Sequence, residues 1–134
     1  MILVTGGIYQ GKRRFAETQL LKRADGPQPD GRILRADGAR EDFAQAVLLT
    51  EFQSYIRRQV HAHVSMQELT CDLEQLLAEN PDVVITMSET GSGIVPMQKF
   101  ERDWREAAGR AGVFLAKRAD MVYRVMAGIG IRIK

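Results

Sequence analysis

Met1-Ile-Leu-Val-Thr-Gly-Gly-Ile-Tyr-Gln-Gly-Lys-Arg13 is the stretch that decides the fold of this chain. Residues 2–5 form a short apolar run rich in β-branched side chains, which predicts a strand buried on both faces. Residues 6–12 then match the phosphate-binding pattern of a glycine, four residues, a glycine and a lysine. Residues 14–21 can follow as a helix. In such an arrangement the backbone amides of the loop and the N-terminus of the helix together bind an anion such as a phosphate.

We therefore predict that this loop binds the phosphates of a nucleotide, and that Lys12 places a charge on the β- and γ-phosphates. Arg13 departs from the pattern, because a Ser or Thr usually follows the lysine and gives its hydroxyl to Mg²⁺. Arginine neutralises phosphate but has no lone pair for a metal. The alternative is a glycine-rich turn that binds nothing, and the strand–loop–helix order favours phosphate binding. The predicted binding residues are Gly6, Gly7, Ile8, Tyr9, Gln10, Gly11, Lys12 and Arg13.

Length and composition set the outer limits of the interpretation. With 134 residues, the chain is expected to form a single domain over residues 1–134. Its 45% hydrophobic and 27% charged residues are typical of a soluble globular protein, and a formal charge of +2 is too small to indicate nucleic acid. No apolar run reaches the length of a membrane span, and Met1 leads directly into a strand, so we expect no signal peptide. A lone cysteine, Cys71, suits a reducing compartment, and we expect a cytoplasmic protein.

Periodicity predicts alternating strands and helices along the rest of the chain. Residues 46–52 are ambiguous, because Phe43, Val47 and Thr50 would also line one helical face, and their apolar compactness favours a strand. Ser65 and Glu68 have the spacing of a capping box at the start of a helix that Asn80-Pro81 ends. We expect loops at 25–31 and 88–96, a helix end near Lys22-Arg23 and a turn at 128–130. The strands are expected at 2–5, 32–36, 46–52, 83–87, 121–126 and 131–133, and the helices at 14–21, 41–46, 53–60, 65–80 and 97–119.

This alternation predicts an α/β fold, namely a P-loop NTPase-like three-layer domain. Its sheet would be mainly parallel, with an antiparallel C-terminal edge strand. Ligands of such sheets lie beyond the carboxyl ends of the strands. The loops at 6–12, 37–38 and 88–96 would meet there, and Thr50 and Glu51 would join them.

Charged side chains near the predicted site are the remaining candidates. Glu89 follows a buried strand, where it could act as a base or, through water, as a partner of magnesium. A surface acid in a loop explains it equally well. Arg102 and Arg105 occupy neighbouring positions on the following helix, and Arg110 lies close to them. A solvated helix face is the default interpretation for such charges.

The chain also resembles a known family. The stretch from Met1 to Gly7 with Gly11-Lys12 is similar to the opening of adenosylcobinamide kinase/adenosylcobinamide-phosphate guanylyltransferase, a family of cobalamin-biosynthesis enzymes. The similarity is stronger in the last fifty or so residues and is fairly specific there. It is carried by residues 89–96 (Glu-Thr-Gly-Ser-Gly-Ile-Val-Pro), Arg102 to Arg105, Ala108-Gly109-Arg110, Ala119-Asp120 and residues 128–134 (Gly-Ile-Gly-Ile-Arg-Ile-Lys).

The resemblance implies a fold, substrates and an assembly. It implies phosphoryl transfer from ATP or GTP, with Mg²⁺, to the aminopropanol hydroxyl of adenosylcobinamide, followed by transfer of GMP from GTP. Lys12 and Glu89 would be catalytic, and Glu51, Arg102 and Arg105 would be metal or substrate ligands. Arg102 and Arg105 would meet a phosphate across a subunit boundary, because members of the family are often trimers.

Two departures from the family limit what is carried over. The bifunctional enzymes use a histidine between the second and third strands to take GMP, and residues 24–60 contain no histidine. His61 and His63 follow the third strand, so we assign them no role and predict the kinase step alone. Thr50 stands where the family has a metal-binding acid. Glu51 comes one residue later, which in a strand would turn its side chain to the other face. The alternatives are a catalytically weak nucleotide-binding regulator or subunit of the same fold, and a kinase for another small metabolite.

Overall fold

A six-stranded sheet forms the centre of the computed structural model, which describes residues 1–21, 32–91 and 93–134. The strand order is β2-β3-β4-β1-β5-β6, in which β1 to β5 run parallel and β6 runs antiparallel to β5. This confirms the predicted α/β class, with a mainly parallel sheet and an antiparallel C-terminal edge. The strands are β1 (Ile2–Gly6), β2 (Arg32–Arg35), β3 (Ala46–Thr50), β4 (Val84–Ser88), β5 (Met121–Met126) and β6 (Ile129–Arg132).

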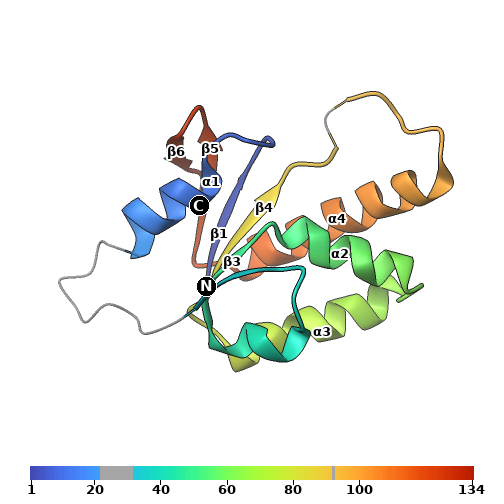
Figure 1. Ribbon diagram of the computed structural model, residues 1–134, viewed down its shortest axis with the longest axis horizontal. Coiled ribbons are helices and arrows are strands. Elements are labelled where there is room, and N and C mark those ends of the chain that lie inside the picture. Colours follow the sequence, from blue (N-terminus) through green and yellow to red (C-terminus); the bar gives the residue numbers. More distant parts are fainter. Residues whose placement is uncertain (22–31, 92) are drawn as a thin grey trace.

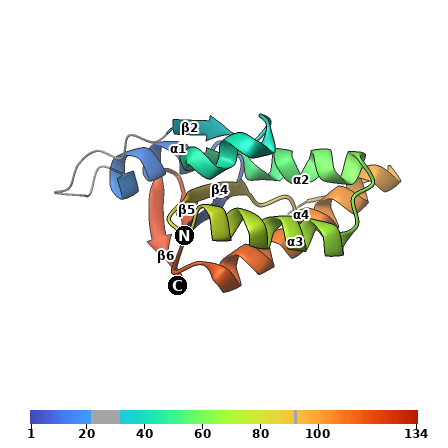
Figure 2. The same ribbon diagram turned by 90° about the horizontal axis from the view of Figure 1, so that it is seen from below.

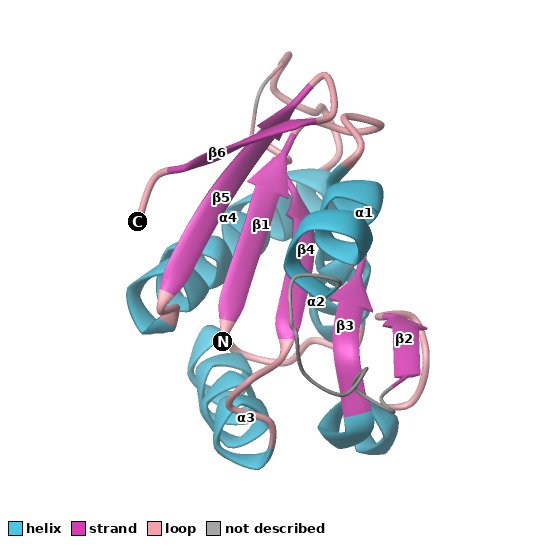
Figure 3. Ribbon diagram, turned by 90° about the vertical axis from the view of Figure 1, so that its left-hand side faces the viewer, coloured by secondary structure: helices cyan, strands magenta, loops and turns pink. Residues whose placement is uncertain are grey.

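Helices cover both faces of the sheet (Figure 1, Figure 2). In Figure 3, α1 lies in front of the sheet, and α2 and α4 lie behind it. The predicted loop at 25–31 and the helix end at Lys22-Arg23 lie outside the described residues. No helix within the described ranges combines the length and the apolar composition that a lipid bilayer demands. The helices are α1 (Lys12–Phe15), which continues as the π-helix η1 (Ala16–Leu21), the 3-10 helix η2 (Arg40–Gln45), α2 (Phe52–His61), α3 (Met66–Glu79) and α4 (Lys99–Arg118).

Alternation along the strands divides the core into two apolar clusters. Even-numbered β1 and β4 residues, such as Val4 and Val84, pack with Ala16 on the α1 face of the sheet. Odd-numbered residues, such as Leu3 and Ile85, pack with α2, α3 and α4 on the other face. The parity of a strand residue therefore tells which face its side chain occupies.

Two predicted boundaries were wrong. The chain turns at Ala127-Gly128, whose φ values of 49° and 81° are left-handed, and Ile129 and Gly130 already belong to β6. The strand expected at 46–52 ends at Thr50, and Glu51 adopts a left-handed conformation before α2 begins. Both errors come from residues that leave extended geometry without a Gly-Pro or Asn-Gly signal. The capping box of Ser65 and Glu68 is confirmed.

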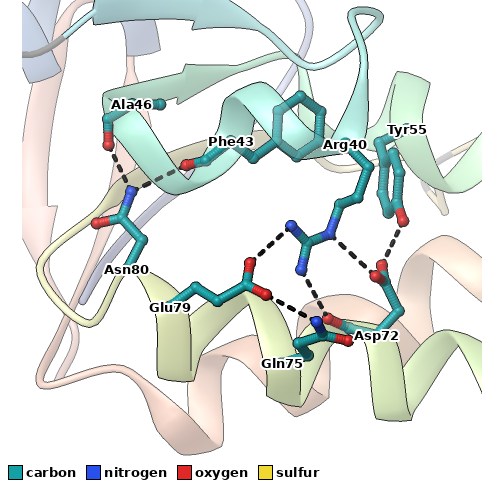
Figure 4. A network of polar contacts seen from close by, with 8 residues as sticks. All are labelled: Arg40, Phe43, Ala46, Tyr55, Asp72, Gln75, Glu79 and Asn80. Atoms are coloured by element: carbon teal, nitrogen blue, oxygen red, sulfur yellow. Dashed lines mark hydrogen bonds and ion pairs between the residues drawn. The ribbon is translucent and has the colours of Figure 1, made fainter.

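A polar network joins α3 to the segment between β2 and β3 (Figure 4). Arg40 donates to Asp72 at 2.9 Å and to Glu79 at 3.1 Å. Tyr55 donates its hydroxyl to the same Asp72, and burial together with this hydrogen bond raises the pKa of Tyr55 above its ordinary value. Asn80 donates to the main-chain carbonyls of Phe43 in this segment, at 3.0 Å, and of Ala46 at the start of β3, at 2.7 Å. The network fixes α3 against the edge of the fold.

Because only 19% of its side chain is exposed, Arg40 should matter for stability. We expect Arg40→Gln to lower the free energy of unfolding by about 1.5–3 kcal/mol, since charged hydrogen bonds are lost and two carboxylates keep no counter-charge. Arg35, whose side chain is 65% exposed beside Asp37, is the matched control, and Arg35→Gln should have no measurable effect. Urea unfolding of both variants tests this, and equal losses would contradict the role of the network.

Candidate functional site

The glycine-rich loop leaves β1 with a backbone that curls on itself. Gly6 has φ 147°, and a Cβ built on it would lie 2.3 Å from the carbonyl oxygen of Val125, so only glycine fits there. Tyr9 and Gly11 are left-handed, with φ 58° and 85°, and Gly11 caps the start of α1. Left-handed residues in such a loop, together with the free amides of a helix start, form an anion-binding concavity.

The hairpin between β5 and β6 supports this loop from the side. The side-chain oxygen of Gln10 accepts a hydrogen bond from the amide of Ala127 at 2.7 Å, and its main-chain oxygen accepts one from Gly128 at 2.9 Å. Gly130 is needed nearby, because a Cβ there would lie 2.2 Å from the ring of Phe15. The C-terminal Gly-Ile-Gly stretch is therefore part of the scaffold of the loop.

Lys12 lies at the bottom of the loop with only 4% of its surface exposed. Its Nζ donates to the carbonyl oxygen of Gly7 at 2.8 Å. Burial lowers the pKa of Lys12, and the carboxylates of Glu51 and Glu89 oppose that shift. The structure thus brings all three side chains, predicted from separate parts of the sequence, to one electrostatic site.

Glu51 reaches this site by a route that differs from the predicted one. With φ 56° and ψ 44° it has left the strand, so the rule that alternate residues face opposite sides does not apply to it. Its amide donates to the hydroxyl of Thr86 at 3.3 Å. Its carboxylate accepts a hydrogen bond of 2.6 Å from the side chain of buried Gln53, which itself accepts one from the amide of Ser88 at 2.9 Å. The left-handed turn therefore fixes the carboxylate beside the loop.

A groove of about 600 Å³ runs along the loop and α1. Arg13 borders it, but its Nε pairs with Glu17 at 2.7 Å and its side chain is 65% exposed. The Arg13 guanidinium would therefore have to leave Glu17 before it could pair fully with an anion in the groove. The groove is lined by residues 9–14, Glu17, Thr18 and Glu51.

Glu89 lies beyond β4, where its amide donates to the carbonyl oxygen of Gly6 at 3.0 Å. Its carboxylate accepts two hydrogen bonds from Arg124 of β5, both at 3.0 Å. This bidentate pair holds Glu89 over a second cavity, of about 420 Å³, on the α4 face of the sheet. The floor of the cavity is apolar, and Gly109 and Gly112 leave α4 without side chains along one wall.

Arg102 and Arg105 do not reach the groove. Arg102 donates to the carbonyl oxygens of Pro96 and Met97 at 3.0 and 2.6 Å, and Arg105 donates to those of Thr90 and Ile94 at 2.8 and 2.6 Å. Both arginines therefore hold the loop that follows Glu89. Arg110 pairs with Glu106 on the exposed face of α4.

Two other sequence candidates lie apart from the site. The turn at Asp37-Gly38 follows the edge strand β2, which β3 and β4 separate from β1, and it does not line the groove. His61 packs edge-on against Phe100, with ring centroids 5.7 Å apart.

A magnesium ion fits the oxygen donors of this site when a nucleotide is bound. In the described part of the chain no three acidic, cysteine or histidine side chains gather into a metal site of their own. Mg²⁺ does not need such a cage, because it commonly binds one or two carboxylates, phosphate oxygens and waters. Glu51 and Glu89 are the carboxylates beside Lys12 that could serve in this way. The hydroxyl oxygen of Ser88 is buried and has no hydrogen-bond partner among the described residues.

Sequence reasoning missed Gln53 and Arg124, which hold the two carboxylates. Gln53 follows Glu51 by two residues, but a glutamine at the start of a helix carries no signal of such a contact. Arg124 is the one charged residue in the strand Met121–Met126, and this lone charge is the signal that was available.

The chain is similar in sequence to a family of known proteins. A family model described as cobinamide kinase / cobinamide phosphate guanyltransferase matches residues 35–133. The bifunctional adenosylcobalamin biosynthesis protein CobU of Salmonella typhimurium is 29% identical over 186 residues, which cover 100% of this chain and 99% of that protein. CobU of Escherichia coli is 28% identical over 180 residues with the same coverage. Both alignments are longer than the chain itself, so the chain lacks positions that these relatives have.

Proposed function

The chain belongs to the cobinamide kinase / cobinamide phosphate guanyltransferase family, and from that premise we propose that it phosphorylates adenosylcobinamide with ATP or GTP. The γ-phosphoryl group would pass to the hydroxyl of the aminopropanol arm, with release of ADP or GDP. One observation carries the proposal, namely that Lys12, Glu51 and Glu89 interact electrostatically around a glycine-rich phosphate loop. The same premise supports one nucleotide-binding domain over residues 1–134.

Positioning and charge neutralisation would supply most of the catalysis. The loop amides would hold the β-phosphate, and Lys12 would turn from the Gly7 carbonyl to the γ-phosphate. Glu51 and Glu89 would hold Mg²⁺ together with phosphate oxygens and water, and the ion neutralises charge on the phosphates when it is bound. Glu89 is also placed to accept the proton of the acceptor hydroxyl while the bond between the γ-phosphorus and its bridging oxygen breaks.

The cavity beside Glu89 gives the acceptor a place distinct from the nucleotide groove. Its volume of about 420 Å³ admits a short organic arm but not a whole corrin ring. Val113 and Ile133 line this cavity and are 57% and 61% exposed. The bulk of the acceptor would rest against these apolar side chains outside the cavity.

The proposal is limited to the kinase step. The names of both relatives describe bifunctional proteins, but no histidine occurs between residues 24 and 60, where the family's GMP-accepting histidine is expected. We therefore expect no covalent guanylylated intermediate in this chain.

Two labelled substrates test the proposal directly. Incubation of the protein with adenosylcobinamide and γ-labelled ATP or GTP should give labelled adenosylcobinamide phosphate. Incubation with α-labelled GTP should leave no labelled protein band. Tight triphosphate binding without phosphorylation of adenosylcobinamide would reject the kinase and favour a nucleotide-binding regulator or subunit. An acid-labile band lost on changing His61 or His63 would reject the restriction to one step.

We also propose that the protein is a homo-oligomer, a trimer by its resemblance to the family. The edge strand β6 supports this, because Ile129 and Ile131 are 68% and 50% exposed on it. Light scattering of the purified protein tests the proposal, and a monomeric mass at micromolar concentration would contradict it.

Arg13 gives a testable prediction about the metal. Replacing this exposed side chain costs little stability, and a threonine adds the missing hydroxyl beside Lys12. We expect Arg13→Thr to raise turnover about 3- to 10-fold and to lower the Mg²⁺ concentration for half-maximal rate. Arg35→Thr is the control, because the Arg35 side chain is as exposed as that of Arg13, pairs with Asp37 away from the groove, and should leave both unchanged. A fall in activity in Arg13→Thr would mean that Arg13 itself contacts the transferred phosphoryl group.

A further inference from the structure

Ser88 at the end of β4 is a buried polar residue whose hydroxyl does nothing within the described fold. Only 3% of the residue is exposed, and its Oγ has no hydrogen-bond partner among the described residues. A buried unsatisfied hydroxyl opposes folding, so its presence needs an explanation. By contrast, the neighbouring hydroxyl of Thr86 already accepts the amide of Glu51.

Strand parity places the Ser88 side chain on the α1 face of the sheet, the face of the phosphate loop. Val84 lies four residues earlier in β4, so it has the same parity, and it packs on that face with Val4 and Ala16. In the sheet register Ser88 lies opposite Gly6, the first residue of the loop, and α1 contacts β4. On this parity the hydroxyl faces the side of the phosphate loop, while Ser88 as a residue also contributes to the lining of the cavity beside Glu89.

The main chain of Ser88 is also tied to the candidate metal ligands. Its amide donates to Gln53 at 2.9 Å, and Gln53 donates to the carboxylate of Glu51 at 2.6 Å. The next residue is Glu89, whose amide is fixed to Gly6. These hydrogen bonds thus tie the residue with the unused hydroxyl to the two carboxylates that interact with Lys12.

We propose that Ser88 supplies the neutral hydroxyl ligand for the divalent cation of the bound triphosphate, the ligand that the residue after Lys12 cannot supply in this chain. This inference rests on the proposed function. Position 13 is an arginine, which has no lone pair to give, whereas a serine hydroxyl has two. When the metal–triphosphate complex binds, the cation would give this buried hydroxyl the partner that it lacks in the described fold.

Binding measurements test the proposal apart from activity. We expect Ser88→Ala to weaken binding of a non-hydrolysable GTP analogue about 3- to 10-fold with Mg²⁺ and to leave it unchanged in EDTA. Electron paramagnetic resonance should show a matching loss of Mn²⁺ affinity in the ternary complex. Adding Arg13→Thr to Ser88→Ala should restore that affinity, because a hydroxyl returns to the cation from the other side of Lys12.

A change of metal preference provides the second arm. In a Cys71→Ser background, which removes the only natural thiol, Ser88→Cys should lose affinity for the Mg²⁺ complex and recover it with Cd²⁺, since thiolates prefer softer ions. Thr70→Cys on α3 is the control and should show no such switch. Thermal unfolding of each variant checks that it folds, and we expect no loss of stability in Ser88→Ala, because that variant removes a hydroxyl without a partner.

Two outcomes separate this inference from the proposed function. If wild type phosphorylates adenosylcobinamide but Ser88→Ala keeps full Mn²⁺ affinity and Ser88→Cys shows no preference for Cd²⁺, the role of Ser88 is wrong and the kinase stands. If wild type binds the metal–triphosphate complex through Ser88 without phosphorylating adenosylcobinamide, the kinase is wrong and the metal ligand stands. Failure of wild type to bind the metal–triphosphate complex would overturn both.

Discussion

Lys12→Met should lower phosphoryl transfer by about 10²–10³-fold, because the variant loses the buried cation of the phosphate loop, which would neutralise the charge that develops on the γ-phosphate. Triphosphate binding should weaken by about 1.5–3 kcal/mol, the value of a charge-assisted contact. Methionine is unbranched and only one atom shorter than lysine, so it should fill most of the same space, although it loses the hydrogen bond to the Gly7 carbonyl. Calorimetric titration with a non-hydrolysable triphosphate and steady-state turnover measure the two effects.

The same variant should not be less stable at neutral pH. Burial lowers the pKa of Lys12, so the folded chain binds this proton more weakly than the unfolded chain does. By linkage, the folded state gains stability as pH rises through the window between the folded and unfolded pKa values of Lys12, and below that window the buried charge opposes folding. Lys12→Met removes this cost and the pH dependence that comes with it.

A matched control separates the charge of Lys12 from the overall charge of the protein. Lys99, on α4, pairs with Asp103 and has an 83% exposed side chain, so Lys99→Met should leave binding, turnover and stability unchanged. Equal triphosphate affinity in wild type and Lys12→Met would contradict the assignment of the loop as a phosphate site.

Local signals explain why the fold and the loop could be predicted. The apolar run of β1, the glycines and Lys12 are adjacent in sequence, so their geometry follows from backbone rules alone. The capping box of α3 is equally local. Glu51 was expected near the loop as a residue at the end of a strand, but it reaches the site through a left-handed backbone conformation. Nothing in a Thr-Glu-Phe sequence predicts that conformation.

Long-range contacts explain what the sequence could not predict. Arg124 meets Glu89 only because β5 and β4 both flank β1 in the sheet, although 35 positions separate them along the chain. The hairpin at Ala127 reaches Gln10 across 117 positions. Such contacts depend on strand order, and the resemblance of the C-terminal stretch to a family indicated its importance without indicating what it touches.

Glu89→Gln should lower turnover by about 10²–10⁴-fold if Glu89 accepts the proton of the acceptor hydroxyl. Glutamine has nearly the same shape and can still accept from Arg124, but it cannot take a proton at neutral pH. If Glu89 acts mainly as this base and Glu51 is enough to hold the metal, triphosphate affinity should change little and excess Mg²⁺ should not restore the rate. If Glu89 instead acts through the metal, the rate loss should diminish as Mg²⁺ is raised.

The controls for Glu89 use its ion pair and a distant acid. The Glu106 side chain is 62% exposed and pairs with Arg110. Glu106→Gln should therefore leave turnover unchanged. Arg124→Gln keeps the carboxylate but removes the bidentate hydrogen bonds that orient it. It should cost less activity than Glu89→Gln, because Glu89 keeps its carboxylate but is held less firmly over the acceptor cavity. Wild-type turnover in Glu89→Gln would show that the proton leaves by another route, most simply to a γ-phosphate oxygen, and that Glu89 and Arg124 serve only to hold the loop.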